Sequence, residues 1–185
     1  MPPKVCPAWV GYLLVSPLRK VFQSPEKILG PYVEPGKMVL EIGCAMGFFS
    51  LPLARMVGKE GKVVCADIQE KMLRSLRKRA LKARVDDRII IRLCDQNSLG
   101  LKEFDDKIDF TLAFAVVHEV PDVSGFFGEV SKAMKSVGRC LVAEPKAHVS
   151  LEKFEATLSL ARDKGFLAVD RPKIAWSHAA LLVKQ

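Results

Sequence analysis

The stretch Val-Leu-Glu-Ile-Gly-Cys-Ala-Met-Gly-Phe-Phe-Ser, residues 39–50, decides the fold of this chain. It begins as a short apolar run, breaks at Gly43 and Gly47, and continues with apolar residues at helical spacing. This order predicts a buried strand, a tight turn and a helix. Glycine permits backbone angles and close contacts that a side chain would block, and the free N–H groups of the following helix favour an anionic group. The stretch therefore predicts either a ligand site or an ordinary strand–turn–helix corner.

Length and composition indicate one globular domain. The 185 residues are 49% hydrophobic and 27% charged, which is typical of a chain with one substantial core. The net charge of +8 permits an acidic partner such as nucleic acid or a membrane surface. The five cysteines lack paired spacing, so we expect reduced, mostly buried thiols and neither a disulfide framework nor a metal site. No stretch has the length of a membrane span, so we expect a cytoplasmic location.

Outward from the glycine turn, apolar runs alternate with helical patterns. Short, continuously apolar strands that alternate with helices predict a parallel sheet covered on both faces. We expect an α/β fold with a Rossmann-like, doubly wound, seven-stranded sheet, mostly parallel with one antiparallel edge strand. The expected strands are residues 37–42, 62–66, 88–93, 108–117, 139–143, 166–169 and 179–184, and the main expected helices are residues 48–57, 69–84, 122–135 and 151–164.

The expected domain organisation is a single domain over residues 24–185 that follows an N-terminal extension of residues 1–23. The extension carries Trp9, Tyr12 and Phe22, which are candidates for the wall of a substrate site. We therefore expect it to act as a substrate cap. Packing of this amphipathic segment on the parent domain is favoured over packing on a lipid surface.

Polar side chains stand at or just past the ends of five expected strands: Glu41, Asp67, Asp95, His118 and Glu144. Because the carboxyl ends of parallel strands meet at one edge, we expect these groups on the rim where such sheets bind ligands. Asp67 is placed to hold two ribose hydroxyls of a nucleoside bound over the glycine turn. Asp95 is placed to accept a hydrogen bond from an exocyclic amine such as that of adenine.

The glycine pattern narrows the choice of nucleoside cofactor. A dinucleotide fingerprint has glycine at three places, but Ala45 and Phe48 occupy the second and third of them. Neither Tyr12 nor Tyr32 is followed one helical turn later by the lysine of a proton relay for hydride transfer. The Gly-Lys-Ser/Thr pattern of a P-loop is absent. The sequence thus argues against a pyrophosphate-containing cofactor and against a P-loop NTPase.

Several motifs resemble those of class I S-adenosylmethionine-dependent methyltransferases. Residues 41–47 resemble the E/D-x-G-x-G-x-G turn with alanine at the middle glycine, Asp67 resembles the ribose-binding acid, and residues 94–96 resemble the adenine-contacting motif. Residues 109–120 and the turn at 136–139 resemble the branch that includes ubiquinone/menaquinone biosynthesis C-methyltransferases, although that turn has lost its proline and second glycine. The resemblance covers residues 25–185 and implies S-adenosylmethionine as the cofactor.

The resemblance also implies a set of site residues. It implies that the methionine portion lies over residues 43–47 and that the sulfonium points toward residues 113–115. His118 is the candidate catalytic base at that rim, and a structural role in the loop after the fourth strand is the alternative. The implied cofactor-binding residues are Glu41, Gly43, Cys44, Ala45, Met46, Gly47, Phe48, Asp67, Ile68, Asp95, Gln96, Ala113 and Phe114.

Three functions remain open at this point. Direct in-line methyl transfer to a small or lipid-like molecule is favoured, because the fourth-strand motif lacks the Asn/Asp-Pro-Pro-aromatic signature of amino-group methylation on bases. An RNA or protein methyltransferase is the first alternative, and it rests on the net charge and on the basic face of helix 69–84. A cofactor-binding subunit without catalysis is the second, because no insertion is present to cover a substrate.

Overall fold

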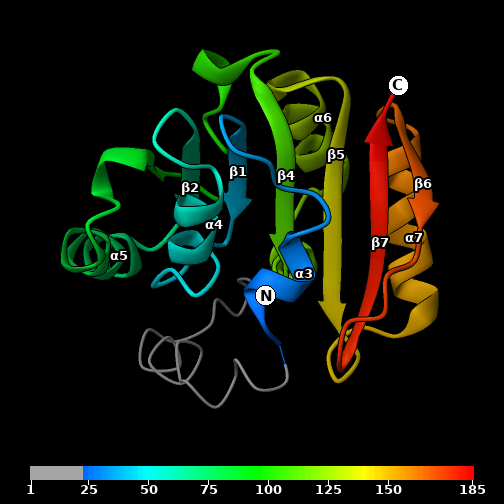
Figure 1. Cartoon of the computed structure of the whole chain (residues 1–185). Coiled ribbons are helices and arrows are strands. Elements are labelled where there is room, and N and C mark those ends of the chain that lie inside the picture. The colour runs from blue at the N-terminus through cyan, green and yellow to red at the C-terminus, as the bar shows by residue number, and fades with distance from the viewer. Residues whose placement is uncertain (1–22) are drawn as a thin grey trace.

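A computed structural model describes residues 23–185, which form one sheet with helices on both faces (Figure 1). The predictions for Cys6, Trp9, Tyr12 and Phe22 lie outside the described residues. In chain order the elements are α3 (Pro25–Leu29), β1 (Met38–Ile42), α4 (Ser50–Met56), β2 (Lys62–Asp67), α5 (Glu70–Ala83), η1 (Asp86–Arg88), β3 (Ile89–Leu93), η2 (Lys102–Phe104), β4 (Ile108–Phe114), η3 (Val117–Glu119), α6 (Val123–Ala133), β5 (Met134–Pro145), α7 (Leu151–Arg162), β6 (Phe166–Asp170) and β7 (Ser177–Lys184).

The sheet has seven strands in the order β3-β2-β1-β4-β5-β7-β6. Strands β1 to β5 are parallel, and β7 is antiparallel to both of its neighbours, β5 and the outermost strand β6. The predicted fold class, a doubly wound, seven-stranded sheet that is mostly parallel with one antiparallel edge, is confirmed. The antiparallel strand is β7, which lies one place in from the outermost strand β6. The carboxyl ends of β1 to β5 meet at one edge of the sheet, the lower edge in Figure 1, which we call the carboxyl edge.

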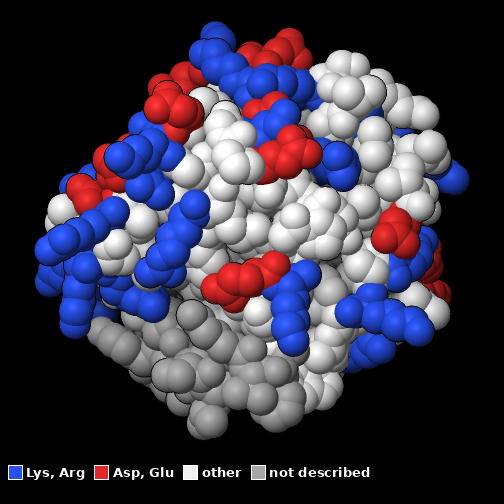
Figure 2. Space-filling view, viewed as in Figure 1, with Lys and Arg blue, Asp and Glu red and all other residues white. Residues whose placement is uncertain are grey.

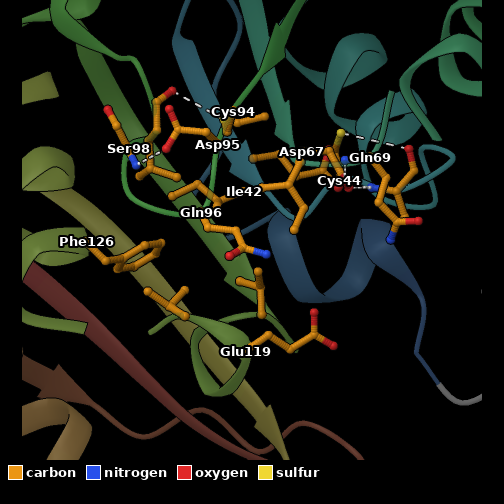
Figure 3. A pocket seen from close by; sticks show the side chains of 18 of the residues that line it. Ile42, Cys44, Asp67, Gln69, Cys94, Asp95, Gln96, Ser98, Glu119 and Phe126 are labelled. Carbon is orange, nitrogen blue, oxygen red and sulfur yellow. Dashed lines mark hydrogen bonds between the residues drawn. The ribbon is translucent and has the colours of Figure 1, made fainter. Parts of the chain in front are cut away.

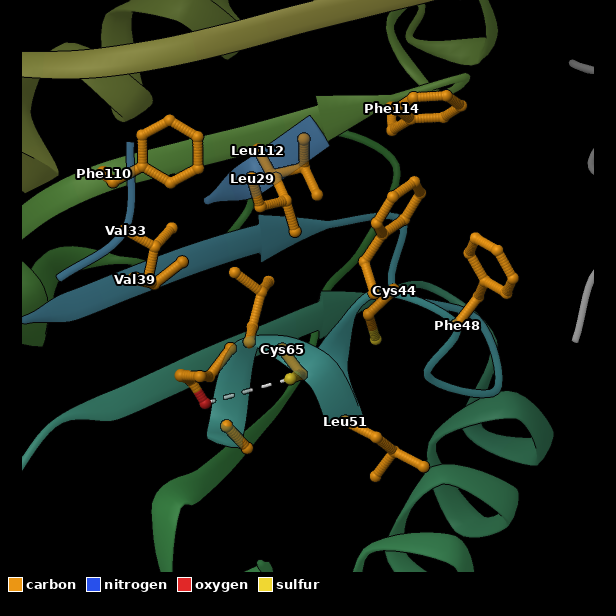
Figure 4. Packing of buried hydrophobic residues seen from close by; sticks show 14 of the residues in the cluster. Leu29, Val33, Val39, Cys44, Phe48, Leu51, Cys65, Phe110, Leu112 and Phe114 are labelled. Atoms are coloured by element: carbon orange, nitrogen blue, oxygen red, sulfur yellow. Dashed lines mark hydrogen bonds between the residues drawn. The ribbon is translucent and has the colours of Figure 1, made fainter. Parts of the chain in front are cut away.

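Each face of the sheet is covered by its own hydrophobic core. Adjacent residues of β1 point to opposite faces, so Val39 belongs to one core and Leu40 to the other. The first core packs β1, β2 and β4 against Leu29 of α3, Leu53 of α4 and Leu76 of α5 (Figure 4). The second core packs the other face against α6 and α7. Strands covered on both faces are apolar throughout, which is why the sequence shows them as unbroken apolar runs.

The region between α6 and β5 differs from the prediction. The helix was expected to continue to Lys135 and to be followed by a turn at residues 137–138, but α6 ends at Ala133 and β5 begins at Met134. Met134 pairs with Ile108, and the register then shifts so that Arg139 pairs with Phe110. The expected turn is therefore a large bulge inside β5. Its left-handed residue is Val137, with φ +57°.

Four cysteines in residues 23–185 have buried, free thiols, as the sequence predicted: Cys44, Cys65, Cys94 and Cys140. Burial raises the pKa of Cys94 to about 11 and that of Cys140 to about 12, so both thiols are protonated near neutral pH. Among the described helices, none combines the length and the apolar composition that crossing a bilayer requires.

Candidate functional site

A pocket opens at the carboxyl edge of the sheet, above the ends of β1, β2, β3 and β4 (Figure 3). This is the point where the strand order reverses, with β1 between β2 and β4, and doubly wound sheets bind ligands at such a point. The walls come from the loops that follow these four strands and from the first half of α6. The lining covers residues 41–45, 48–49, 66–69, 72, 94–99, 114–116, 119–122, 125–126 and 129.

The glycine turn forms one wall of the pocket. Gly43 and Gly47 have φ of +70° and +86°, in the region that favours glycine. A Cβ on Gly43 would stand 2.8 Å from Cγ2 of Val116, so this glycine lets the loops after β1 and β4 pack closely. Ala45, at the position of the replaced glycine, also has a positive φ, of +46°. An alanine in this conformation carries backbone strain of about 1 kcal/mol.

Asp67 links the glycine turn to the loop after β2. One carboxylate oxygen accepts from the backbone N–H of Ala45 at 2.8 Å, and the other accepts from the N–H of Gln69 at 2.8 Å. Burial raises the pKa of Asp67, although these backbone hydrogen bonds oppose the shift. Each carboxylate oxygen has two lone pairs, so both can still accept from a ligand hydroxyl. Asp67 is thus rigidly oriented and able to accept two hydroxyl donors.

Asp95 holds the loop after β3 in place. Its Oδ1 atom accepts from the N–H groups of Asn97 at 2.7 Å and Ser98 at 2.8 Å. Glu129 of α6 fixes the same loop, because its carboxylate accepts from Ser98 Oγ at 3.1 Å and from the N–H of Leu99. Glu129 was not predicted from the sequence. It stands inside an amphipathic helix, and no sequence signal separates it from the other polar residues there.

Glu41 lies within β1 and is only 3% exposed, although it reaches the pocket. Its carboxylate accepts a hydrogen bond from Ser50 Oγ at the start of α4. This bond ties the strand to the helix across the glycine turn. The role predicted for Glu41, binding an amino group of the cofactor, remains a prediction.

Most of the predicted cofactor-binding residues lie in the pocket lining, but three do not. Met46 is 1% exposed and turned into the core, where its carbonyl accepts from Arg79. Gly47 faces the side chain of Leu76, and Ala113 is fully buried in β4. The predicted residues in the lining are Glu41, Gly43, Cys44, Ala45, Phe48, Asp67, Ile68, Asp95, Gln96 and Phe114.

His118 stands beside this pocket and is absent from its lining. Its Nδ1 atom contacts the carboxylate of Glu144, which is 1% exposed at the end of β5. The other oxygen of Glu144 accepts from the N–H groups of Val116 at 3.2 Å and Val117 at 2.8 Å. The hydrogen bond to Glu144 raises the pKa of His118, against the opposing effect of burial. His118 is therefore an oriented imidazole with increased basicity.

Glu119 from this loop reaches the pocket, as does Asp122 just before α6. Burial raises the pKa of the Glu119 carboxyl group. Glu119 was not among the cofactor-binding residues predicted from the sequence. Figure 3 shows Glu119, Asp67 and Gln96 around the same hollow, between the loops that follow β2, β3 and β4.

The lining fits a cofactor that combines a nucleoside with an amino acid. Asp67 offers acceptors for hydroxyl groups, and the apolar side chains of Ile68, Leu99 and Phe126 offer faces for a flat base. These are the donor and acceptor types that S-adenosylmethionine requires.

Comparison with known proteins identifies the family. The methyltransferase domain family matches residues 33–177, which is most of the chain. The chain belongs to this family. It is a class I S-adenosylmethionine-dependent methyltransferase domain, as the sequence predicted, and S-adenosylmethionine is its cofactor.

Curated relatives of this methyltransferase domain include two quinone-modifying enzymes. Demethylmenaquinone methyltransferase of Bacillus cereus (strain B4264) is 29% identical over 112 residues, which cover 60% of this chain and 46% of that protein. The ubiquinone/menaquinone biosynthesis C-methyltransferase of Marinomonas sp. is 31% identical over 113 residues, 60% of this chain and 44% of that protein. The chain thus matches less than half the length of these relatives.

Solved structures share the fold of the methyltransferase domain. A SAM-dependent methyltransferase from Aquifex aeolicus superposes with a TM-score of 0.87 at 22% identity, covering 98% of this chain and 100% of that one. Geranyl diphosphate C-methyltransferase from Streptomyces coelicolor superposes with a TM-score of 0.68 at 13% identity, covering 86% and 77%. At these identities the likeness concerns the fold alone.

Proposed function

We propose that this methyltransferase domain transfers a methyl group directly to a small or lipid-like acceptor. The observation that carries the proposal is the apolar character of the pocket beside the glycine turn, where Phe48, Phe49, Phe114 and Val116 contribute to the wall. Such a wall suits a flat, hydrophobic acceptor better than a charged one. The quinone-modifying activities named for the two bacterial relatives support the same class of acceptor.

In the proposed mechanism the chain binds the methyl donor and the acceptor, orients them and excludes water. Bound S-adenosylmethionine supplies a methyl group already activated on a sulfonium, so positioning is the main task of the protein. Asp67 would hold the ribose hydroxyls, and the loop at Asp95 and Gln96 would border the adenine. Residues 43–45 would hold the methionine portion with Glu41, and Phe114 at the end of β4 would border the sulfonium.

We propose His118 as the base that removes a proton from the acceptor when the acceptor must lose one. Support comes from its contact with Glu144, which engages Nδ1 and leaves Nε2 to accept a proton. Glu144 acts through His118 and is a positioning residue. The side chain of His118 is 22% exposed, so water or a substrate can reach it.

Residues 1–23 are proposed as a substrate cap before the single domain of residues 24–185. Deletion of residues 1–22 should leave S-adenosylmethionine affinity within about threefold and abolish turnover. Turnover that survives the deletion would remove the cap from the proposal. The buried free thiols support a reducing, cytoplasmic compartment as part of the same proposal.

The test combines calorimetry with a transfer assay. The intact chain should bind S-adenosylmethionine and S-adenosylhomocysteine, and it should move a labelled methyl group to a prenylated 1,4-naphthoquinol. Cofactor binding with transfer to RNA and none to any quinol would favour an RNA methyltransferase. In that case the exposed basic face of α5, including Lys78 and Lys82, becomes the candidate RNA contact. Cofactor binding without any transfer would favour a non-catalytic subunit.

A further inference from the structure

A second hollow at the carboxyl edge lies outside the cofactor pocket, between the start of α7 and the segment 171–179 that leads from β6 into β7. Phe154 of α7 forms its buried floor. Leu151 and Trp176 stand at its border and are 58% and 62% exposed. We call this hollow, with these three residues and the cations described below, the α7 groove. Large apolar side chains this exposed and this close together indicate a contact surface.

The backbone holds Trp176 in an unusual conformation. Its φ is +59°, in the left-handed region that costs a non-glycine residue about 1–2 kcal/mol. Its carbonyl accepts from the N–H of Lys146 at 2.9 Å, which fixes the segment before β7 to the end of β5. Such strain persists only where the surrounding structure imposes it, and it is concentrated at functional sites.

Cations surround the exposed apolar residues of the α7 groove. Lys146, Arg171 and Lys173 line it, and all three are exposed. The acid in the lining, Glu155, pairs with Arg171 at 3.0 Å. Two lysines therefore give the groove a net positive charge. Figure 2 shows Lys and Arg side chains gathered at the lower right, over the ends of α7 and β7 that lie at the carboxyl edge.

The α7 groove adjoins the proposed catalytic corner. His178 in its lining is paired across the sheet with Glu144, whose carboxylate contacts His118. The α7 groove therefore lies beside the strand pair that carries Glu144, the partner of His118. Both hollows lie at the same edge of the sheet, so one flat surface can approach both.

We propose that the α7 groove docks this enzyme on an anionic lipid bilayer, from which a lipid-like acceptor enters the site. The proposal rests on the lipid-like acceptor of the proposed function. An indole is favourable at the membrane–water interface, and Leu151 adds apolar area beside it. Each lysine near an anionic bilayer contributes about 1 kcal/mol, or about fivefold in affinity. Exposed apolar residues bordered by cations match such an interface, whereas a free anion would require convergent donors in a closed site.

Co-sedimentation with vesicles tests the docking surface. The intact chain should bind vesicles of phosphatidylcholine with 30% phosphatidylglycerol and should bind pure phosphatidylcholine far more weakly. The double variant Lys146→Gln/Lys173→Gln should bind the anionic vesicles about 25-fold more weakly at low salt. The matched control Lys78→Gln/Lys82→Gln removes the same charge from the basic face of α5 and should lose less than threefold.

Tryptophan fluorescence gives a readout at the groove itself. The sequence has two tryptophans, so Trp9→Phe leaves Trp176 as the single reporter. Its emission should shift to the blue and resist quenching by iodide when anionic vesicles are added. Trp176→Ala should weaken sedimentation severalfold, and Trp176→Phe should restore part of the loss.

The outcomes separate this proposal from the proposed function. Equal loss in the α5 control, equal binding to neutral vesicles, or an unshifted Trp176 emission would each overturn the docking surface. Binding of an RNA oligomer that depends on Lys146 and Lys173, without vesicle binding, would overturn it as well. Calorimetry with S-adenosylmethionine and transfer to a detergent-dispersed quinol report on the proposed function independently, because neither needs a bilayer.

Discussion

The two halves of the carboxyl edge use their polar residues differently. On the β2–β3 side, Asp67 and Asp95 line the pocket, and backbone N–H groups orient their carboxylates. On the β4–β5 side, Glu144 is buried, contacts His118 and accepts from two N–H groups of the loop after β4. The same position at a strand end thus faces the pocket in one half and supports a loop in the other.

The difference follows from how the chain continues after each strand. The loop after β2 lines the pocket with Asp67, Ile68 and Gln69, and the carboxylate of Asp67 is held there by backbone N–H groups. The loop after β4 folds back over the end of β5 through the left-handed Ala115, with φ +56°, and it covers Glu144. An acid covered in this way must be paired, because an unpaired buried charge is very unfavourable.

Glu144→Ala should produce the largest effect and should act on stability. It removes the acceptor of two buried N–H groups and of His118, so we expect the free energy of unfolding to fall by about 3 kcal/mol. Denaturant unfolding measures the change. Glu144→Gln keeps an acceptor and should lose less. A stability loss below about 1 kcal/mol for the alanine variant would contradict the supporting role.

Asp67→Ala tests the β2–β3 side of the carboxyl edge, where we propose that Asp67 binds the cofactor. Loss of the hydrogen bonds that two hydroxyl groups would donate to this charged acceptor should weaken S-adenosylmethionine binding about 100-fold, or about 2.7 kcal/mol. Isothermal calorimetry measures the affinity. Asp95→Ala is the companion variant and should cost about tenfold, because Asp95 is assigned a single contact. An affinity within threefold of the parent chain for Asp67→Ala would remove it from the cofactor site.

Gly43→Ala probes the contact between the loop after β1 and the loop after β4. The substitution places a Cβ against Val116 and requires φ +70° of an alanine, so stability should fall by about 2 kcal/mol. Gly36→Ala is the matched control, because Gly36 has φ +80° with open space around the added Cβ. It should lose only the backbone strain of about 1 kcal/mol. Equal losses would show that the contact with Val116 is unimportant.

The smallest effect concerns pH. Glu144 raises the pKa of His118 above its ordinary value of 6.5, so the protonated imidazole stabilises the folded state. This contribution is fully present below pH 6.5 and is lost as the pH rises through the folded-state pKa. An NMR titration of the His118 ring measures the pKa, and Glu144→Gln should lower it. A His118 pKa unchanged by that variant would contradict the pairing.

Much of the fold and of the ligand half of the site was predictable from sequence. Unbroken apolar runs reveal strands buried on both faces, and the spacing of Gly43, Gly47 and Asp67 follows a pattern that the fold requires. The bulge in β5 was not predictable, because it lies between Met134 and Arg139, whose partners on β4 are only two residues apart. Val137 takes its left-handed conformation within this bulge. The positions of Glu129 and Glu119 in the pocket were not predictable for a similar reason, since their neighbours in space are distant in sequence.

By itself, the sequence determined the order of strands and helices, the glycine turn and the acids at the strand ends, because these depend on local patterns. Only the tertiary structure decided which of those acids face the pocket and which are covered. That choice depends on how loops from different strands pack at one edge, and the contact between Glu144 and His118 joins residues on two such strands. Trp176 became part of a proposed docking surface only because the fold brings Lys146 and Leu151 to the same groove.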